Sequence, residues 1–249
     1  MCNRQLFFKL CQNLSKIVPE GKYKEILRLI FYKILSIPIG ITTIEIKNTK
    51  IKLIKTITMI DNKNEVEDYL KFCNIKEGDV VLDCGAFYGV FAIFCAKNNK
   101  TGKVICIEPD PTAMKLLKKN IDINKCNNIE ILNMGLGKTN QEMMLSAGGA
   151  GSTIYRKGIT KVQIMKGDYL FQHMEKIDII KMNIEGAEID ALNGMKDILK
   201  KFKPLLLIMA DHEINGRITY FEVMDILKDI GYENITLTDK KMVVASWKK

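Results

Sequence analysis

The 249-residue sequence lacks an apolar run long enough to cross a lipid bilayer. A transmembrane helix needs about 20 apolar residues, whereas the apolar stretch at residues 26–35 is interrupted by Arg28 and Lys33 and is followed by Pro38. No small-residue cleavage site follows an uninterrupted apolar core, so the pattern of a secretory leader is missing as well. We therefore expect no transmembrane segment and no cleaved signal.

The sequence also lacks a Cys-x-x-Cys pair, and its seven cysteines are odd in number. Several of them fall at apolar strand or helix positions, where a thiol behaves as a small buried hydrophobic group. Free thiols are typical of proteins in a reducing compartment. We therefore expect a cytoplasmic protein.

No internal repeat and no low-complexity linker divides the chain. Its content of 47% apolar and 27% charged residues is ordinary for a globular protein with one main domain. The net charge of +9 comes from lysines that are spread along the chain rather than packed into a basic tract. Charge of this kind favours a polyanionic partner only weakly, so we do not expect nucleic-acid binding from charge alone.

The most informative motif lies at residues 80–89. Val80–Leu82 is a short apolar run typical of a parallel strand that is covered on both faces. Asp83 follows at the predicted strand end, and Gly85 and Gly89 flank a turn into an apolar helix, where a ligand can approach the backbone and unpaired N–H groups. This Asp-x-Gly-x-x-x-Gly spacing differs from the G-x-G-x-x-G of dinucleotide-binding turns. Because an acid here would repel a pyrophosphate but suits a cationic amino group, S-adenosylmethionine fits better than NAD.

A second acidic residue follows the next predicted strand. Lys103–Ile107 leads to Glu108, and a carboxylate at that strand end can accept hydrogen bonds from both ribose hydroxyls of a cofactor. Pro109 and Pro111 mark the start of a helix, because proline is tolerated in the first helical turn. Cys84 would border the cofactor, unless it is simply a small turn residue. The Asp83 turn and the Glu108 strand end together predict a cofactor site. The alternative is that both acids only cap strand ends in another doubly wound fold that binds no cofactor there.

Strands and helices alternate through the rest of the chain. Periodicity predicts a short helix at 65–73, further helices at 112–124, 187–199 and 220–230, and strands at 129–132, 177–182, 205–209, 235–238 and 242–247. Glycines within residues 141–165 predict a hairpin or a mobile loop. The alternation ends in an antiparallel hairpin, which predicts an α/β fold with a doubly wound, seven-stranded, mostly parallel sheet. This pattern is similar to the Rossmann-like class I methyltransferase sheet.

The N-terminal region differs from the rest. Residues 1–37 mix basic and apolar residues at approximately helical spacing, and residues 41–59 alternate as strands do. We divide the chain into an N-terminal helical and extended region at 1–60 and a main domain at 61–249. The N-terminal helices are expected to pack on the main domain as a lid; weak peripheral contact with a membrane surface is the alternative.

A third motif, Lys181-Met182-Asn183-Ile184-Glu185-Gly186-Ala187-Glu188, follows the fourth predicted strand. With Asp83-Cys84-Gly85-Ala86, Glu108-Pro109, Leu192-Asn193-Gly194 and Pro204, it resembles the FkbM family of S-adenosylmethionine-dependent methyltransferases over roughly residues 78–213. The resemblance implies that the cofactor contacts Asp83, Cys84, Gly85, Ala86, Gly89, Glu108 and Pro109. Two positions depart from the family pattern, because Asn183 replaces an aspartate and Phe87 replaces a common asparagine.

The resemblance implies methyl transfer, and family members mostly O-methylate sugars and other small metabolites. The chain has no [Asp/Asn/Ser]-Pro-Pro-aromatic run at its fourth strand and no Pro-Cys nucleophile. Those motifs belong to enzymes that methylate amino groups or the cytosine ring carbon. We therefore expect a small-molecule hydroxyl acceptor.

Methyl transfer needs an acceptor in line with the methyl group and a residue that takes the hydroxyl proton. Glu185 follows the fourth strand and His212 follows the fifth, so both are expected at one crevice. His212 is the candidate base because the unperturbed pKa of histidine is near neutrality; a solvent-exposed loop residue is the alternative. Glu185 would orient the substrate or stabilise the following helix start. We assign no metal ligand, although Glu185 with Asp211 and Glu213 has the chemistry for a divalent ion.

Two other functions stay open. An RNA methyltransferase would agree with the positive net charge and would need a basic surface that converges on the Asp83 crevice. A non-catalytic scaffold would bind a partner protein through its N-terminal helices and would fold without binding S-adenosylmethionine.

Overall fold

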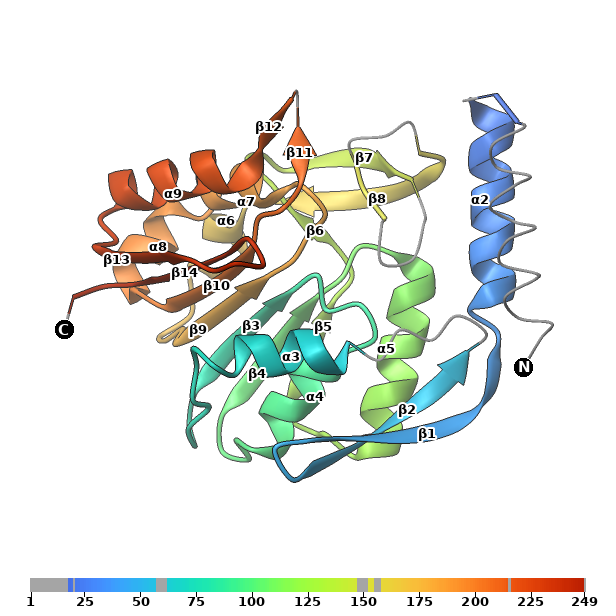
Figure 1. Ribbon diagram of the computed structural model, residues 1–249, viewed down its shortest axis with the longest axis horizontal. Helices are drawn as coiled ribbons and strands as arrows, with labels where there is room; N and C mark the ends of the chain where they lie inside the picture. Colours follow the sequence, from blue (N-terminus) through green and yellow to red (C-terminus); the bar gives the residue numbers. More distant parts are fainter. Residues whose placement is uncertain are drawn as a thin grey trace.

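A seven-stranded sheet forms the centre of the computed structural model, which describes residues 18–19, 21–56, 62–146, 152–154, 158–214 and 216–248. Figure 1 shows the sheet with its twist. The strand order is β13-β14-β10-β9-β3-β4-β5. These strands are β3 (Val80–Cys84), β4 (Lys103–Ile107), β5 (Ile129–Leu132), β9 (Ile179–Met182), β10 (Leu205–Met209), β13 (Asn234–Leu237) and β14 (Met242–Ser246).

Neighbouring strands from β10 to β5 are parallel, and β14 is antiparallel to both β10 and β13. The strand β3 pairs with β4 on one side and with β9 on the other. The direction of winding therefore changes at β3, and open α/β sheets bind ligands at such a switch, beyond the carboxyl ends of the strands. The predicted doubly wound, seven-stranded, mostly parallel sheet is confirmed.

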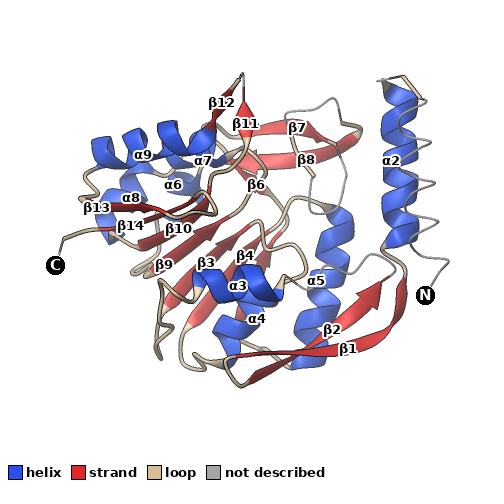
Figure 2. Ribbon diagram, viewed as in Figure 1, coloured by secondary structure: helices blue, strands red, loops and turns tan. Residues whose placement is uncertain are grey.

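Helices cover both faces of the sheet (Figure 2). Val81 of β3 packs in one core cluster, with side chains of α3 (Lys63–Tyr69), α4 (Val90–Lys97) and α5 (Pro111–Asn124). Leu82, one residue later, packs in the other cluster, with α6 (Gly167–Phe171), α7 (Glu188–Asn193), α8 (Lys196–Phe202) and α9 (Thr219–Ile230). Because side chains alternate along a strand, residue parity decides which face each side chain meets.

One predicted helix is two helices in the structure. The pattern at 187–199 predicted a continuous helix, but α7 ends at Asn193 and α8 begins at Lys196. A Cβ atom at Gly194 would lie 2.0 Å from the carbonyl oxygen of Gly137, so this position admits only glycine. The break between α7 and α8 therefore lies against the backbone of a neighbouring loop, a contact that the helical periodicity of the segment does not reveal.

The N-terminal region contains α2 (Lys22–Leu35) and a hairpin of β1 (Pro38–Ile46) and β2 (Thr49–Thr56). The hairpin packs on the sheet domain, because Ile46, Ile51 and Leu53 are buried in the same cluster as the side chains of α4. The α2 helix is held by its buried Glu25, which accepts a 2.7 Å hydrogen bond from the hydroxyl of Ser146.

A single buried amide side chain joins the hairpin to the turn after β3. The Oδ1 atom of Asn120, in α5, accepts a 2.7 Å hydrogen bond from the backbone N–H of Ile54. Its Nδ2 group donates a 2.9 Å hydrogen bond to the carbonyl oxygen of Tyr88. The hairpin, α5 and the turn after β3 are therefore connected through this one side chain.

A smaller sheet lies beside the carboxyl ends of the main strands. It is formed by β6 (Gly135–Leu136), β7 (Gln141–Leu145) and β8 (Thr160–Met165), and β7 and β8 make the predicted hairpin. A further short hairpin joins β11 (Glu213–Ile214) and β12 (Arg217–Ile218). The predicted helical pattern before residue 18 and the glycines at 148, 149 and 151 lie outside the described residues. Among the described residues, no helix combines the length and apolarity required to cross a membrane.

Candidate active site

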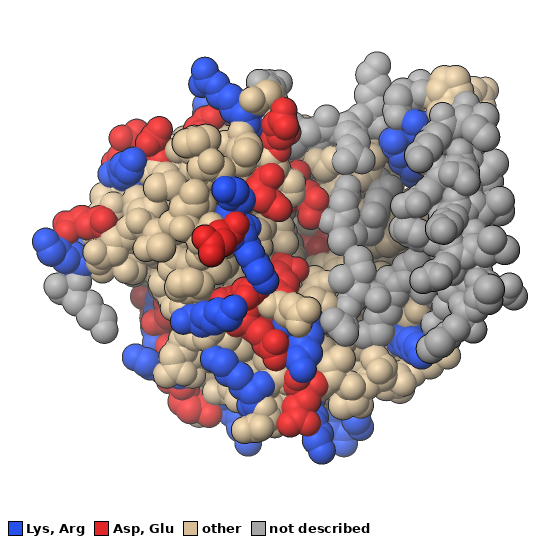
Figure 3. Space-filling model, in the orientation of Figure 1, with Lys and Arg blue, Asp and Glu red and all other residues tan. Residues whose placement is uncertain are grey.

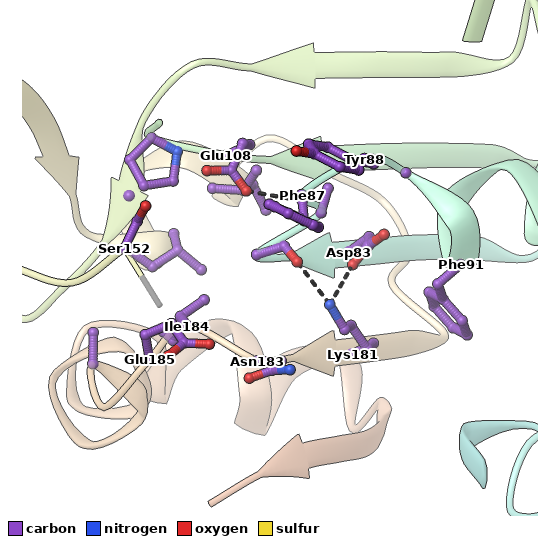
Figure 4. A pocket seen from close by; sticks show the side chains of 18 of the residues that line it. Asp83, Phe87, Tyr88, Phe91, Glu108, Ser152, Lys181, Asn183, Ile184 and Glu185 are labelled. Atoms are coloured by element: carbon purple, nitrogen blue, oxygen red, sulfur yellow. Dashed lines mark hydrogen bonds and ion pairs between the residues drawn. The ribbon is translucent and has the colours of Figure 1, made fainter. Parts of the chain in front are cut away.

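A cavity of about 280 Å³ opens at the carboxyl ends of β3, β4 and β9. Its lining comes from α3, the turn between β3 and α4, the small sheet, and the segment that follows β9. Figure 4 shows Glu108 from the β4 side and Asn183 and Glu185 from the β9 side, with Asp83 and Lys181 pointing toward one another. The three sequence motifs therefore meet in one cavity.

The turn after β3 brings backbone close to the segment after β9. Gly85 has a φ of +74°, and a Cβ atom there would lie 1.9 Å from the carbonyl oxygen of Asn183. Gly89, with a φ of +81°, begins α4. Phe87 also has a positive φ, of +50°, and its ring stacks on Tyr88 at a centroid distance of 3.8 Å. Phe87 thus places an aromatic surface at the cavity where the family commonly has asparagine.

Asp83 is 1% exposed and forms an ion pair with Lys181, whose Nζ atom lies 3.0 Å from its Oδ1 atom. The pairing follows from the register, because Asp83 and Lys181 are partners on neighbouring parallel strands and share a face of the sheet. Lys181 also donates a 2.8 Å hydrogen bond to the carbonyl oxygen of Gly85. Among the described residues, Lys181 is the cation that balances the Asp83 carboxylate, and neither carboxylate oxygen has a well-aligned hydrogen-bond donor.

Glu108 is a buried carboxyl group at the end of β4. Its Oε2 atom accepts a 2.8 Å hydrogen bond from the N–H of Phe87, and Oε1 accepts one of 2.9 Å from the N–H of Asp110. Burial raises the pKa of Glu108 to about 7, although both backbone donors favour the ionised form. Each oxygen keeps a second lone pair, so the carboxylate can still accept two further hydrogen bonds.

The helix start after Glu108 forms as predicted. Asp110 caps α5 by accepting hydrogen bonds from the N–H groups of Thr112 and Ala113, and Pro111 is the first helical residue. The hydroxyl of Ser152 donates a 2.7 Å hydrogen bond to Asp110 and also lines the cavity. This contact connects the segment after β7 to the Glu108 side of the cavity.

The other predicted cofactor residues differ in position. Ala86 and Pro109 line the cavity together with Gly85 and Gly89. Cys84 has the opposite parity from Asp83, so its completely buried side chain packs in the cluster with α6 to α9. Burial raises the pKa of the Cys84 thiol above its ordinary range. At Cys84 the backbone leads into the turn beside the cavity, but the thiol lies in the core and does not line the cavity.

Glu185 and His212 are in contact, but Glu185 lines the cavity and His212 does not. The Nε2 atom of His212 lies 3.4 Å from Oε2 of Glu185, and Nδ1 lies 3.6 Å from Asp211 and 3.8 Å from Glu188. The hydrogen bond with Glu185 raises the pKa of His212, burial opposes this shift, and the remaining two carboxylates add to it. Glu185 lines the cavity, and the 23% exposed side chain of His212 lies behind it.

Glu188 fixes the turn that carries Glu185. Its fully buried side chain accepts hydrogen bonds from the N–H groups of Ile184, at 3.0 Å, and Gly186, at 3.3 Å. Burial raises the pKa of Glu188, while His212 and the backbone donors oppose the shift. Glu185 has a φ of +57°, so this network holds a backbone conformation that non-glycine residues rarely adopt. The described residues contain no group of three or more ligands arranged for a metal ion.

Sequence reasoning missed the α3 residues at the cavity. Glu65 and Tyr69 line it, and the Tyr69 hydroxyl donates a 2.6 Å hydrogen bond to Glu65. Asn183 donates another, of 2.9 Å, to the same carboxylate oxygen. The i, i+4 spacing of Glu65 and Tyr69 on a short predicted helix was a signal for their contact, but only the packing of α3 places them beside β9.

The residues of the cavity fit S-adenosylmethionine. The turn that contains Gly85 lines the cavity, and the free lone pairs of Glu108 suit two ribose hydroxyls. Pro109 and Ile164 lie close to Gly135, and all three line the cavity and form an apolar wall for a base. Acidic groups at the β3 and β9 ends suit a ligand that carries an ammonium and a sulfonium group.

Comparison with known proteins agrees with this geometry. The family model for the methyltransferase FkbM domain matches residues 83–233. A protein named Methyltransferase 1 from Beauveria bassiana is 20% identical over 145 residues, which are 47% of this chain and 58% of that protein. The hexuronic acid methyltransferase AglP of Haloferax volcanii is 25% identical over 131 residues, which are 50% of this chain and 53% of AglP. This chain thus aligns with somewhat more than half the length of each of these two relatives.

Solved structures show the same fold. The crystal structure of an FkbM methyltransferase from Methylobacillus flagellatus aligns with a TM-score of 0.53 and 20% identity, over 71% of this chain and 45% of that one. A precorrin-6y C5,15-methyltransferase from Geobacter metallireducens aligns with a TM-score of 0.52 and 12% identity, over 79% and 95% of the two chains. The fold, the three motifs in one cavity and the family match over most of the chain agree, and the chain belongs to the FkbM methyltransferase family.

Proposed function

We propose that this protein transfers a methyl group from S-adenosylmethionine to a hydroxyl group of a sugar or another small metabolite. The observation that carries the proposal is the contact between Glu185, at the cavity wall, and His212, 3.4 Å behind it. This pair lies at the ends of adjacent strands, beside the Asp83 and Glu108 motifs. The name of AglP, a hexuronic acid methyltransferase, supports a sugar acceptor.

The cavity residues divide the binding of the cofactor between them. Glu108 would accept hydrogen bonds from the ribose, the turn at Gly85 would admit the methionine part, and Pro109 would pack against the base. When bound, S-adenosylmethionine supplies a methyl group on a sulfonium that an oxygen nucleophile can attack. The apolar side chains Phe87 and Ile184 would exclude water from this part of the cavity.

Glu185 and His212 would act together on the acceptor proton. A hydroxyl in the cavity would meet the Glu185 carboxylate first, and the proton can pass to the pair because Oε2 of Glu185 faces Nε2 of His212. Nearby carboxylates favour the protonated imidazole, so the pair can hold the proton after transfer. Glu188 would keep Glu185 in position through the turn at Gly186.

The location of the protein is part of the same proposal. We infer a cytoplasmic methyltransferase, because the cysteines among the described residues are all free and buried. An RNA substrate is less well supported. On the face shown in Figure 3, basic and acidic side chains are interspersed over the described surface, and no continuous basic surface is visible there.

The first experiment is calorimetric titration of the purified protein with S-adenosylmethionine and S-adenosylhomocysteine. Micromolar binding that is lost in Glu108→Ala would support the cofactor assignment, and transfer of a labelled methyl group to uronic acids and other hydroxylated metabolites would then test the acceptor. The matched control is Glu130→Ala, an exposed carboxylate one strand away that pairs with Lys103. A folded wild-type protein that binds neither compound would refute the proposal and favour a scaffold.

A further inference from the structure

We propose that Glu65 of α3, rather than the motif residue Asp83, binds the ammonium group of the cofactor's methionine part. This inference rests on the proposed function. It assigns a binding residue that lies outside the segment matched by the family model, which begins at residue 83.

The charge of Asp83 is already compensated. Its carboxylate and the Lys181 ammonium are both nearly inaccessible and lie 3.0 Å apart. Lys181 is held in place by its hydrogen bond to the carbonyl oxygen of Gly85. A ligand ammonium at the Oδ2 atom of Asp83 would therefore meet a carboxylate whose charge an internal cation already balances, and it would gain less there than at a carboxylate without such a cation.

Glu65, by contrast, is held only by neutral donors. Its Oε1 atom accepts hydrogen bonds from the Tyr69 hydroxyl and the Asn183 amide, at 2.6 and 2.9 Å. Burial raises the pKa of Tyr69 well above its ordinary value, so the phenol keeps its proton and stays a donor. Within the described ranges, no ion pair joins Glu65 to a basic side chain. The carboxylate lines the cavity and is oriented without being neutralised.

The charges of Asp83, Glu65 and Lys181 together can be balanced by one further cation. Burial lowers the pKa of Lys181, but Asp83 and Glu65 outweigh this effect and the net shift is upward. Lys181 therefore stays charged between the two carboxylates. Two carboxylates and one ammonium leave one negative charge, which a ligand ammonium would balance at the wall formed by Glu65.

The same contact explains why Asn183 is tolerated where the family pattern has aspartate. An aspartate at this position would place a second carboxylate within hydrogen-bond distance of Glu65, and one of the two acids would have to be protonated. The Asn183 amide instead donates to Glu65 and fixes its orientation. In this chain the carboxylate on that side of the cavity comes from α3 rather than from the end of β9.

Two ligands separate this role from a structural one. S-adenosylhomocysteine carries the ammonium group, and 5′-methylthioadenosine keeps the adenosine and the thioether but has no amino-acid part. We expect Glu65→Gln to weaken S-adenosylhomocysteine about 10- to 100-fold by calorimetry and to change 5′-methylthioadenosine less than about twofold. The control is Glu67→Gln on the same helix, whose partly exposed side chain pairs with Lys63 at 3.7 Å and should affect neither ligand.

A charge swap tests the placement directly. The double variant Glu65→Gln with Asn183→Asp returns one carboxylate to this wall and should recover most of the lost affinity for S-adenosylhomocysteine. Unchanged binding in Glu65→Gln, or an equal loss of both ligands with a lowered melting temperature, would overturn the inference. Failure of the wild-type protein to bind S-adenosylhomocysteine is a separate result that would refute the proposed function as well.

Discussion

Glu108 should make cofactor binding depend on pH near neutrality. Its pKa of about 7 in the free protein means that the carboxyl group is protonated below this pH. A protonated carboxyl has lost the charge that favours hydrogen bonds from ribose hydroxyls. We expect the affinity for S-adenosylhomocysteine to be constant above about pH 8 and to fall by up to about tenfold per pH unit below 7.

Calorimetry between pH 5.5 and 8.5 measures this dependence. The control is Glu108→Gln, which has no carboxyl group and should bind more weakly with a flatter pH profile. A wild-type profile as flat as that of the variant would show that Glu108 is not the titrating group.

His212 should titrate above the ordinary pH for a histidine. Glu185 is the largest cause of the raised pKa, so Glu185→Gln should move the His212 titration to lower pH. The chain has two histidines, and His173→Gln assigns their resonances in a proton NMR titration. A His212 titration that does not move in Glu185→Gln would contradict the contact between the two side chains.

At the scale of single residues, the sequence predicted the acids but not their charge partners. The positions of Asp83, Glu108 and Glu185 follow from strand ends, which apolar runs reveal. The Asp83 to Lys181 ion pair depends on the register of two strands that are almost 100 residues apart, and no local pattern specifies it. Cys84 points into the core on the α6 to α9 side because of the same alternation that directs the buried Asp83 side chain to the other face of the sheet.

At the scale of the element, the turns before and after β3 should tolerate side chains unequally. Gly78 and Gly85 have similar φ values, +85° and +74°, but a Cβ atom meets nothing within 4 Å at Gly78 and meets backbone at 1.9 Å at Gly85. We expect Gly78→Ala to lower the free energy of unfolding by about 1 kcal/mol through φ strain alone. Gly85→Ala should cost about 3 kcal/mol or more because the backbone must also move.

Urea denaturation of the two variants measures the difference. Gly89→Ala provides an intermediate case, because its Cβ atom would meet the flexible side chain of Leu117 at 2.4 Å. Equal costs for Gly78→Ala and Gly85→Ala would show that the turn does not approach Asn183 as described.

Most elements of the main sheet were predictable because long apolar runs and helical spacing report burial. The break between α7 and α8 was not predicted, and it lies where a neighbouring backbone closely approaches Gly194, a contact that no local pattern specifies. The contribution of α3 to the cavity was equally hidden. Its sequence predicts a short helix, but its position beside β9 depends on packing against α4.

At the scale of the whole molecule, we propose that the domain boundary lies between α2 and β1 rather than at residue 60. The three hairpin side chains in the main core, Ile46, Ile51 and Leu53, are no more than 1% exposed. Their removal would lose roughly 5 to 9 kcal/mol of apolar burial, a large part of the stability of a typical domain. Of the described N-terminal residues, α2 then remains as the candidate lid, and its Glu25 contacts Ser146, which directly follows the cavity residue Leu145.

Two truncations test this boundary. A chain of residues 61–249 should show no cooperative thermal transition by circular dichroism, whereas residues 38–249, which keep the hairpin, should retain one. A cooperative transition of residues 61–249 at the melting temperature of the full chain would place the boundary at residue 60.

The two hydrogen bonds of Asn120 have a consequence for protein engineering. One side chain holds the hairpin and the turn after β3, although the family model begins only at residue 83. Grafting the segment matched by the family model onto the N-terminal part of a relative would therefore separate Asn120 from the β2 strand that it holds. Functional chimeras should be joined before the hairpin, so that β2, α5 and the turn are exchanged as a single module.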